Sequence, residues 1–139
     1  MLNFMKERGI NMRNIVAVKN EEGKVCLRIM KSTSVDELKM LCDMIVEVLI
    51  LDGFYDVIVS FNISDSFLSI EINVFDEDYC NIGMVEFISG KGICADETKT
   101  EYYDLFPNVV SVCDCDEWLQ DNWEDSSNKI IKNLIEMFK

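Results

Sequence analysis

The sequence predicts a single α+β domain, in which an antiparallel sheet of about five strands is covered on one face by two helices. Two patterns carry this prediction. Short segments between residues 15 and 89 alternate apolar and polar residues, which is typical of strands with one buried face. Two longer segments, residues 35–51 and 116–138, repeat apolar residues at helical spacing. With 139 residues, 49% of them hydrophobic, the chain has the length of one domain and is not intrinsically disordered.

A hairpin and a capped helix are the first elements. Residues 15–19 are apolar and β-branched, residues 20–23 have the composition of a turn, and residues 24–31 alternate. Ser34 is followed three residues later by Glu37, which is the pattern of a capping box at the start of a helix. We expect this helix to run to about Leu51 and to end at Gly53, a residue type suited to the end of a helix.

Three more strands are predicted as a meander over residues 55–63, 67–75 and 82–89. The polar stretch from Gly90 to Asn108 is interpreted as a long loop, followed by a short edge strand at residues 109–112. The last element is the C-terminal helix, for which a break at residues 125–127 is an alternative, because Ser and Asp favour helix caps.

Residues 1–11 are predicted to be an extension that precedes the domain of residues 12–139. Met12 is a third methionine after Met1 and Met5, and residues 6–9 can be encoded by a purine-rich run like that of a ribosome-binding site. We therefore expect Met12 to be the native start.

Charge is unevenly distributed along the chain. The chain has 26 acidic and 13 basic residues, and residues 52–128 contain eighteen of the acids but only two lysines. Such a field repels phosphate, so direct binding of nucleic acid or of an anionic membrane is not expected. A basic protein partner is favoured. The alternative is that the charge only keeps a small protein in solution.

Motifs for catalysis, metals and cofactors are missing from the sequence. There is no histidine, which removes the usual general base and zinc ligand. Residues 89–92 (Ser-Gly-Lys-Gly) lack the upstream glycine of a phosphate loop, and the acidic runs lack the glycine and distal glutamate of a calcium loop. We expect no cofactor. No export signal is visible, so the six cysteines are expected to be free thiols in a cytoplasmic protein.

The candidate partner-binding residues are acids and aromatic residues in two segments, residues 114–125 and the expected loop. Acids beside exposed aromatic rings suit a cationic groove that accepts an aromatic anchor. The candidates are Asp114, Asp116, Glu117, Trp118, Asp121, Trp123, Glu124, Asp125, Asp96, Glu97, Glu101, Tyr102, Tyr103 and Asp104. We expect Trp118 and Trp123 to anchor the partner and charge reversal at Asp116, Glu117 and Asp121 to abolish binding. The alternative is that these acids complement a helix dipole and the Trp rings face the core.

In size, acidity, lack of catalytic motifs and α+β pattern, the chain is similar to small inhibitors encoded by bacteriophages and mobile elements, such as anti-CRISPR and anti-restriction proteins. A row of carboxylates can imitate the phosphates of a nucleic acid, so this resemblance implies a protein that blocks the basic groove of a nucleic-acid-handling partner. Two alternatives stay open. One is an immunity or chaperone-like protein for a toxin or secreted partner, and the other is a small-ligand domain or enzyme.

Overall fold

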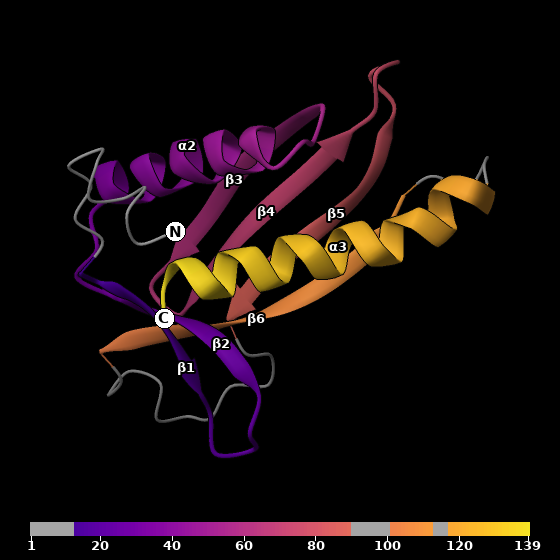
Figure 1. Ribbon diagram of the computed structural model, residues 1–139. Coiled ribbons are helices and arrows are strands. Elements are labelled where there is room, and N and C mark those ends of the chain that lie inside the picture. Colours follow the sequence, from indigo (N-terminus) through magenta and orange to yellow (C-terminus); the bar gives the residue numbers. More distant parts are fainter. Residues whose placement is uncertain (1–12, 90–100, 113–116) are drawn as a thin grey trace.

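The computed structural model describes residues 13–89, 101–112 and 117–139, and in the last range it describes side chains from residue 122. In these ranges the chain forms a six-stranded sheet with two helices packed on one of its faces (Figure 1). The predicted α+β fold is confirmed, with one strand more than expected. The predicted extension at residues 1–11 lies outside the described residues.

The strands follow the spatial order β1-β2-β6-β5-β4-β3, and every neighbouring pair is antiparallel. The sixth strand along the chain, β6, therefore joins the N-terminal hairpin to the three-strand meander. The elements are β1 (Ile15–Lys19), β2 (Val25–Met30), α2 (Val35–Leu51), β3 (Asp56–Ser64), β4 (Phe67–Phe75), β5 (Asn81–Ser89), β6 (Tyr102–Ser111) and α3 (Glu117–Met137).

Helix α2 begins and ends as predicted. The Glu37 backbone N–H donates to the Ser34 hydroxyl at 3.1 Å, and the Ser34 backbone N–H donates to the Glu37 carboxylate at 3.4 Å, which completes the capping box. Gly53 adopts a positive φ of 101° just after the helix, where a residue with a Cβ would be strained.

Residues 102–108, expected to belong to a loop, form most of strand β6, so the loop prediction is wrong for them, and residues 109–111 continue this inner strand instead of forming a separate edge strand. Residues 90–100 of the expected loop lie outside the described residues. The first part of β6 pairs with β2, from Met30 opposite Tyr102 to Leu27 opposite Leu105, and residues 105–111 pair with β5. Pro107 lies beyond Leu105, where the pairing of β6 with β2 ends. On this stretch β5 is the one described strand that pairs with β6, so the missing N–H of the proline is tolerated. Residues 102–108 thus lie in an inner strand of the sheet.

Helix α3 is continuous, and the alternative of a break near residues 125–127 is wrong. The Ser127 side chain is buried, and its hydroxyl donates to the Glu124 carbonyl at 2.9 Å, so the helix itself satisfies this polar group. At the other end of α3, the Ala17 backbone N–H of β1 donates to the Phe138 carbonyl at 2.9 Å.

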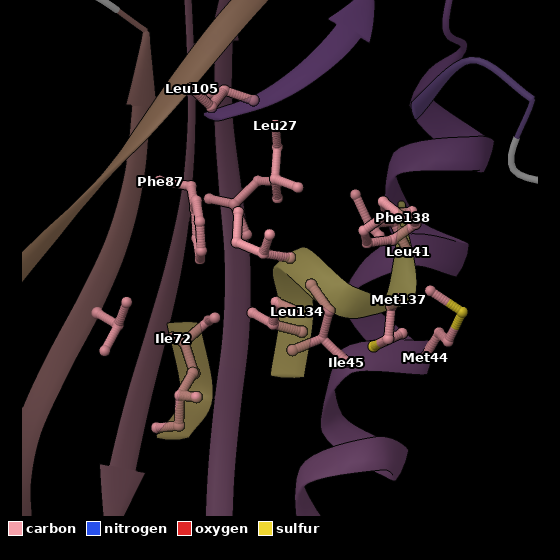
Figure 2. Packing of buried hydrophobic residues seen from close by; sticks show 14 of the residues in the cluster. Leu27, Leu41, Met44, Ile45, Ile72, Phe87, Leu105, Leu134, Met137 and Phe138 are labelled. Atoms are coloured by element: carbon pink, nitrogen blue, oxygen red, sulfur yellow. The ribbon is translucent and has the colours of Figure 1, made fainter. Parts of the chain in front are cut away.

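The core lies between the sheet and the two helices. Figure 2 shows Leu27, Phe87 and Leu105 from the sheet facing Ile45 of α2 and Leu134 of α3. Burial of such side chains from every layer supplies most of the stability of a domain of this size. Within the described residues, neither helix combines the length and apolar character needed to cross a membrane.

Candidate protein-binding site at the acidic end of the sheet

Several acidic side chains lie at one end of the sheet. The register pairs Asp56 with Phe75, Phe75 with Asn81, and Gly83 with Ser111, so β3 and β5 begin and β4 and β6 end at this end. Helix α2 finishes there, toward the upper centre of the view in Figure 1, and α3 starts there, at the right of the view. We use the term acidic end for six described acids of β3, the β4–β5 turn and α3, which are Asp56, Asp76, Glu77, Asp78, Glu124 and Asp125.

Within the described parts of the chain, none of these six acids forms an ion pair. The next basic residue along α3 is Lys129, and its ammonium group has other partners. It donates to the Asp52 carbonyl at 3.0 Å and lies 5.6 Å from the centre of the Phe54 ring. A cation at this position complements the C-terminus of α2. The acidic end is therefore left with a negative field.

The turn between β4 and β5 is built by Asp76. Its carboxylate accepts hydrogen bonds from the backbone N–H groups of Asp78 and Cys80, both at 2.9 Å. Its backbone carbonyl accepts from Tyr79 at 3.0 Å, and its backbone N–H donates to the Cys80 carbonyl at 3.0 Å. With Asp76 holding the turn, the side chains of Glu77 and Asp78 are exposed.

Tyr79 occupies a backbone position that favours glycine. Its φ is 61°, whereas the β1–β2 turn places Gly23 at the corresponding position with φ 82°. The two turns have the same pattern of hydrogen bonds. Asn20 bonds to Gly23 and Lys24 in the β1–β2 turn as Asp76 bonds to Tyr79 and Cys80 in the β4–β5 turn. A left-handed conformation costs a non-glycine residue about 1–2 kcal/mol. The chain therefore keeps a tyrosine where a glycine fits without strain.

Tyr79 and Tyr55 form an exposed aromatic pair within the acidic end. Their exposed fractions are 70% and 51%, and their ring centroids are 6.0 Å apart with an interplanar angle of 72°. Interaction with the Tyr79 hydroxyl, and then partial desolvation and the negative charges of Glu77, Asp56 and Asp78, raise the pKa of Tyr55. Two aromatic faces among carboxylates can bind arginine or lysine side chains of a partner.

The structure describes the sequence-predicted partner-binding residues only in part. Asp96, Glu97, Asp114 and Asp116 lie outside the described residues. Glu117, Trp118 and Asp121 lie on the first turns of α3, where the backbone alone is described. Glu124 and Asp125 are exposed on α3 and belong to the acidic end.

The aromatic and acidic residues at the start of β6 are structural, contrary to the expectation of a binding loop. Arg28 Nε and Nη2 donate to the two carboxylate oxygens of Asp104 at 2.9 and 3.1 Å, and the Arg28 guanidinium lies 3.9 Å from the centre of the Tyr102 ring. The Tyr103 side chain is buried, and its hydroxyl donates to the Ser64 carbonyl at 2.9 Å. Glu101 is exposed but precedes β6, away from the acidic end.

Trp123 is a core residue, so its expected role as an exposed anchor is wrong. Only 3% of its surface is exposed, and its ring packs on Gly83 of β5. Its position in the apolar stripe of α3 explains this burial. Among the side chains that the structure describes, the exposed aromatic residues at this end are Tyr55 and Tyr79, which sequence reasoning missed. The sequence contains a signal for Tyr79, because residues 76–79 (Asp-Glu-Asp-Tyr) align with the turn residues 20–23 (Asn-Glu-Glu-Gly) and place the tyrosine at the position of the glycine.

The described residues contain no group of three or more cysteine, aspartate and glutamate side chains arranged to hold a metal ion. Cys26, Cys42 and Cys80 are free thiols. Comparisons of the chain with protein-family models, curated proteins and solved structures find no match.

Proposed function

We propose that the protein is a binding protein that inhibits a basic, nucleic-acid-handling partner by occupying its cationic groove. The observation that carries the proposal is the acidic end, where Asp56 of β3 and Glu77 and Asp78 of the β4–β5 turn lie near the exposed Tyr55–Tyr79 pair and, among the described residues, have no ion-pair partner. Tyrosine is enriched among the residues that dominate binding energy at protein interfaces. Binding requires no chemistry by the protein and acts one to one.

Electrostatics suits this mode of action. A groove that binds nucleic acid is lined with lysine and arginine, which carboxylates on a rigid scaffold attract in place of phosphates. The formal charge of −13 accelerates encounter with such a groove and disfavours acidic partners. The proposal includes a cytoplasmic location and an origin in a phage or mobile element, which the charge, size and sequence character support.

The strain at Tyr79 also supports a binding role. A residue held in a costly backbone conformation at an exposed position indicates that something other than folding retains it. In the matched β1–β2 turn, where no aromatic pair is formed, the position is a glycine. The tyrosine adds exposed aromatic surface to the acidic end at the expense of the turn.

The test is a pull-down with the tagged full chain from lysate of a related bacterium, washed at low and at high salt. We expect recovery of a basic nucleic-acid-binding protein, with release by high salt and by added DNA or RNA. A partner that nucleic acid fails to displace identifies an immunity or chaperone-like role instead. Absence of any basic partner at low salt would overturn the proposal.

Two variants then locate the site. Tyr79→Gly keeps the turn, because Gly23 occupies the same position in its counterpart, and we expect it to weaken binding at least about tenfold. Glu77→Lys/Asp78→Lys weakens it further. The matched control is Glu21→Lys/Glu22→Lys, which makes the same charge change in the β1–β2 turn. Equal loss of binding in the control and site variants would show that net charge alone, and no defined surface, attracts the partner.

A further inference from the structure

Strand β3 is an outer strand of the sheet with one unpaired side. Its nine residues pair with β4 over their full length without a bulge, and no other described strand pairs with β3. The Val57 backbone N–H donates to the neighbouring Asp56 carboxylate at 2.9 Å, so it points away from β4. Because alternate residues of a strand point their N–H groups to the same side, those of Val59, Phe61 and Ile63 also face outward.

Beyond Asp56, which accepts the Val57 N–H, the centre of this outer side lacks the charged residues, prolines and bulges that protect the edges of sheets. Natural edge strands carry charged residues, prolines or bulges that prevent pairing with another chain. Residues 59–63 of β3 contain none of these. The opposite edge of the sheet is different, because α3 reaches β1 there and the Phe138 carbonyl accepts the Ala17 N–H at 2.9 Å. Of the two described edges, β3 is the one left open along its centre.

The segment is complementary to itself. If a second copy pairs antiparallel about a twofold axis at Phe61, then Phe61 lies opposite Phe61 and Val59 lies opposite Ile63 of the other copy. These apolar pairs lie on the helix side of the sheet, and aromatic and β-branched pairs stabilise adjacent strands. On the other side, Ser60 lies opposite Asn62 of the other copy. No charged group is buried by this register.

Helix α2 borders the same edge and adds charge complementarity. Residues 59–61 and α2 line a shallow groove of about 340 Å³, to which α2 contributes Lys39, Cys42 and Asp43. Lys39 and Asp43 are both exposed. An axis at Phe61 brings Lys39 of one copy toward Asp43 of the other, and the reverse pair follows by symmetry. The antiparallel arrangement also directs the two acidic ends away from each other.

We infer that the outer side of β3 binds a second copy of this chain, so that two sheets join into one continuous sheet in a twofold-symmetric dimer. Backbone hydrogen bonds between residues 59–63 of the two copies supply the affinity, and the side-chain pairs fix the register. The dimer presents two acidic ends in opposite directions. Each end then binds a basic partner independently of the other.

Sedimentation velocity on the full chain over a range of protein concentrations tests the inference. We expect a monomer–dimer equilibrium. Ile63→Lys, which inserts a charge into the paired segment, raises the dimer dissociation constant at least about tenfold. The matched control is Val16→Lys on the opposite edge strand, because the two side chains are 42% and 41% exposed and the charge change is the same. A monomer at all concentrations, open-ended oligomers, or dissociation by Val16→Lys instead would overturn the inference.

A charge swap on α2 tests the register without altering β3. Lys39→Glu places like charges across the axis and weakens the dimer, whereas Lys39→Glu/Asp43→Lys restores the opposite pairing and the dimer. Circular dichroism confirms that each variant is folded. Failure of the double variant to regain affinity would overturn the axis at Phe61.

The experiments distinguish failure of the dimer inference from failure of the proposed inhibitory function. Each copy has a formal charge of −13, so moderate salt screens their repulsion and strengthens the dimer, whereas salt weakens binding of a basic partner. Tyr79→Gly leaves the dimer unchanged, and Ile63→Lys leaves partner binding by a single acidic end unchanged.

Discussion

Gly83 is the residue that allows Trp123 of α3 to approach β5. A Cβ placed on Gly83 meets the Trp123 indole at 2.6 Å from Nε1 and 2.7 Å from Cζ2, which is closer than side-chain atoms pack. The ring is buried at this point, and its Nε1 has no hydrogen-bond partner among the described residues. The contact between α3 and the sheet therefore depends on the missing side chain of one glycine.

Gly83→Ala is expected to lower the free energy of unfolding by about 1–3 kcal/mol, because the indole has to leave its site or the helix has to shift. Urea unfolding measures the change. In a Trp123→Leu background the same substitution removes no indole contact, so its cost falls toward zero. An equal cost in both backgrounds would contradict the packing of Trp123 on Gly83.

The buried thiols of Cys26 and Cys42 make the stability of the folded state depend on pH in the alkaline range. Burial, and to a smaller extent the charge of Asp104, raises the pKa of Cys26 from 9.0 to about 11. Burial, followed by the charge of Asp43, raises the pKa of Cys42 from 9.0 to about 11. The folded state thus keeps both thiols protonated where the unfolded chain ionises them. Their contribution to stability is complete below pH 9.0 and is lost as the pH rises toward about 11.

We expect the free energy of unfolding, measured with urea under reducing conditions, to fall across this pH range. Cys26→Ala/Cys42→Ala makes that fall less steep, whatever its effect at neutral pH. Cys80→Ala is the control, because Cys80 is exposed in the β4–β5 turn. A pH dependence that persists unchanged without the two buried thiols would show that other groups cause it.

At the scale of elements, local signals made α2 and the meander predictable, whereas β6 depended on distant residues. The capping box of α2 lies within four consecutive residues, and β3, β4 and β5 each show the alternation of one buried face. The strand β6 instead carries Asp104, whose partner Arg28 is 76 residues away in the sequence. A charged residue whose partner lies on an adjacent strand is predicted as a loop residue when only the residues beside it in the sequence are considered.

The candidate site was predictable in its charge but not in its aromatic residues. The acidic composition of residues 52–128 indicated a negative surface, and Glu124 and Asp125 lie on it. Trp123 belongs to the apolar stripe of α3. The helical spacing that predicted α3 therefore also indicated that Trp123, the expected anchor, faces the core. Tyr79 was missed because its exposure depends on the left-handed backbone of a turn that contains no glycine.

At the scale of the whole molecule, the fold concentrates negative charge on a rigid support. The Asn133 side chain donates to the Asp52 carboxylate at 2.6 Å and Lys129 donates to the Asp52 carbonyl, so α3 fastens the end of α2. Asp56, Glu77 and Asp78 lie near one another around Tyr55 at the same end of the sheet. Their mutual repulsion opposes folding, and a basic partner of the kind that we propose would relieve it on binding.

Stability and binding should therefore change in opposite directions at the acidic end. Asp78→Lys relieves repulsion and is expected to raise the free energy of unfolding by about 0.5 kcal/mol at low salt, while it weakens partner binding. The control is Glu22→Lys, because Glu22 lies 3.7 Å from Lys24 and its reversal replaces an attraction with a repulsion. Urea unfolding at low and moderate salt measures both variants. Salt should raise the stability of the unaltered chain and reduce the gain from Asp78→Lys, since both effects arise from the same screened repulsion. Destabilisation by Asp78→Lys would mean that the carboxylate holds the β4–β5 turn and is not kept for a partner.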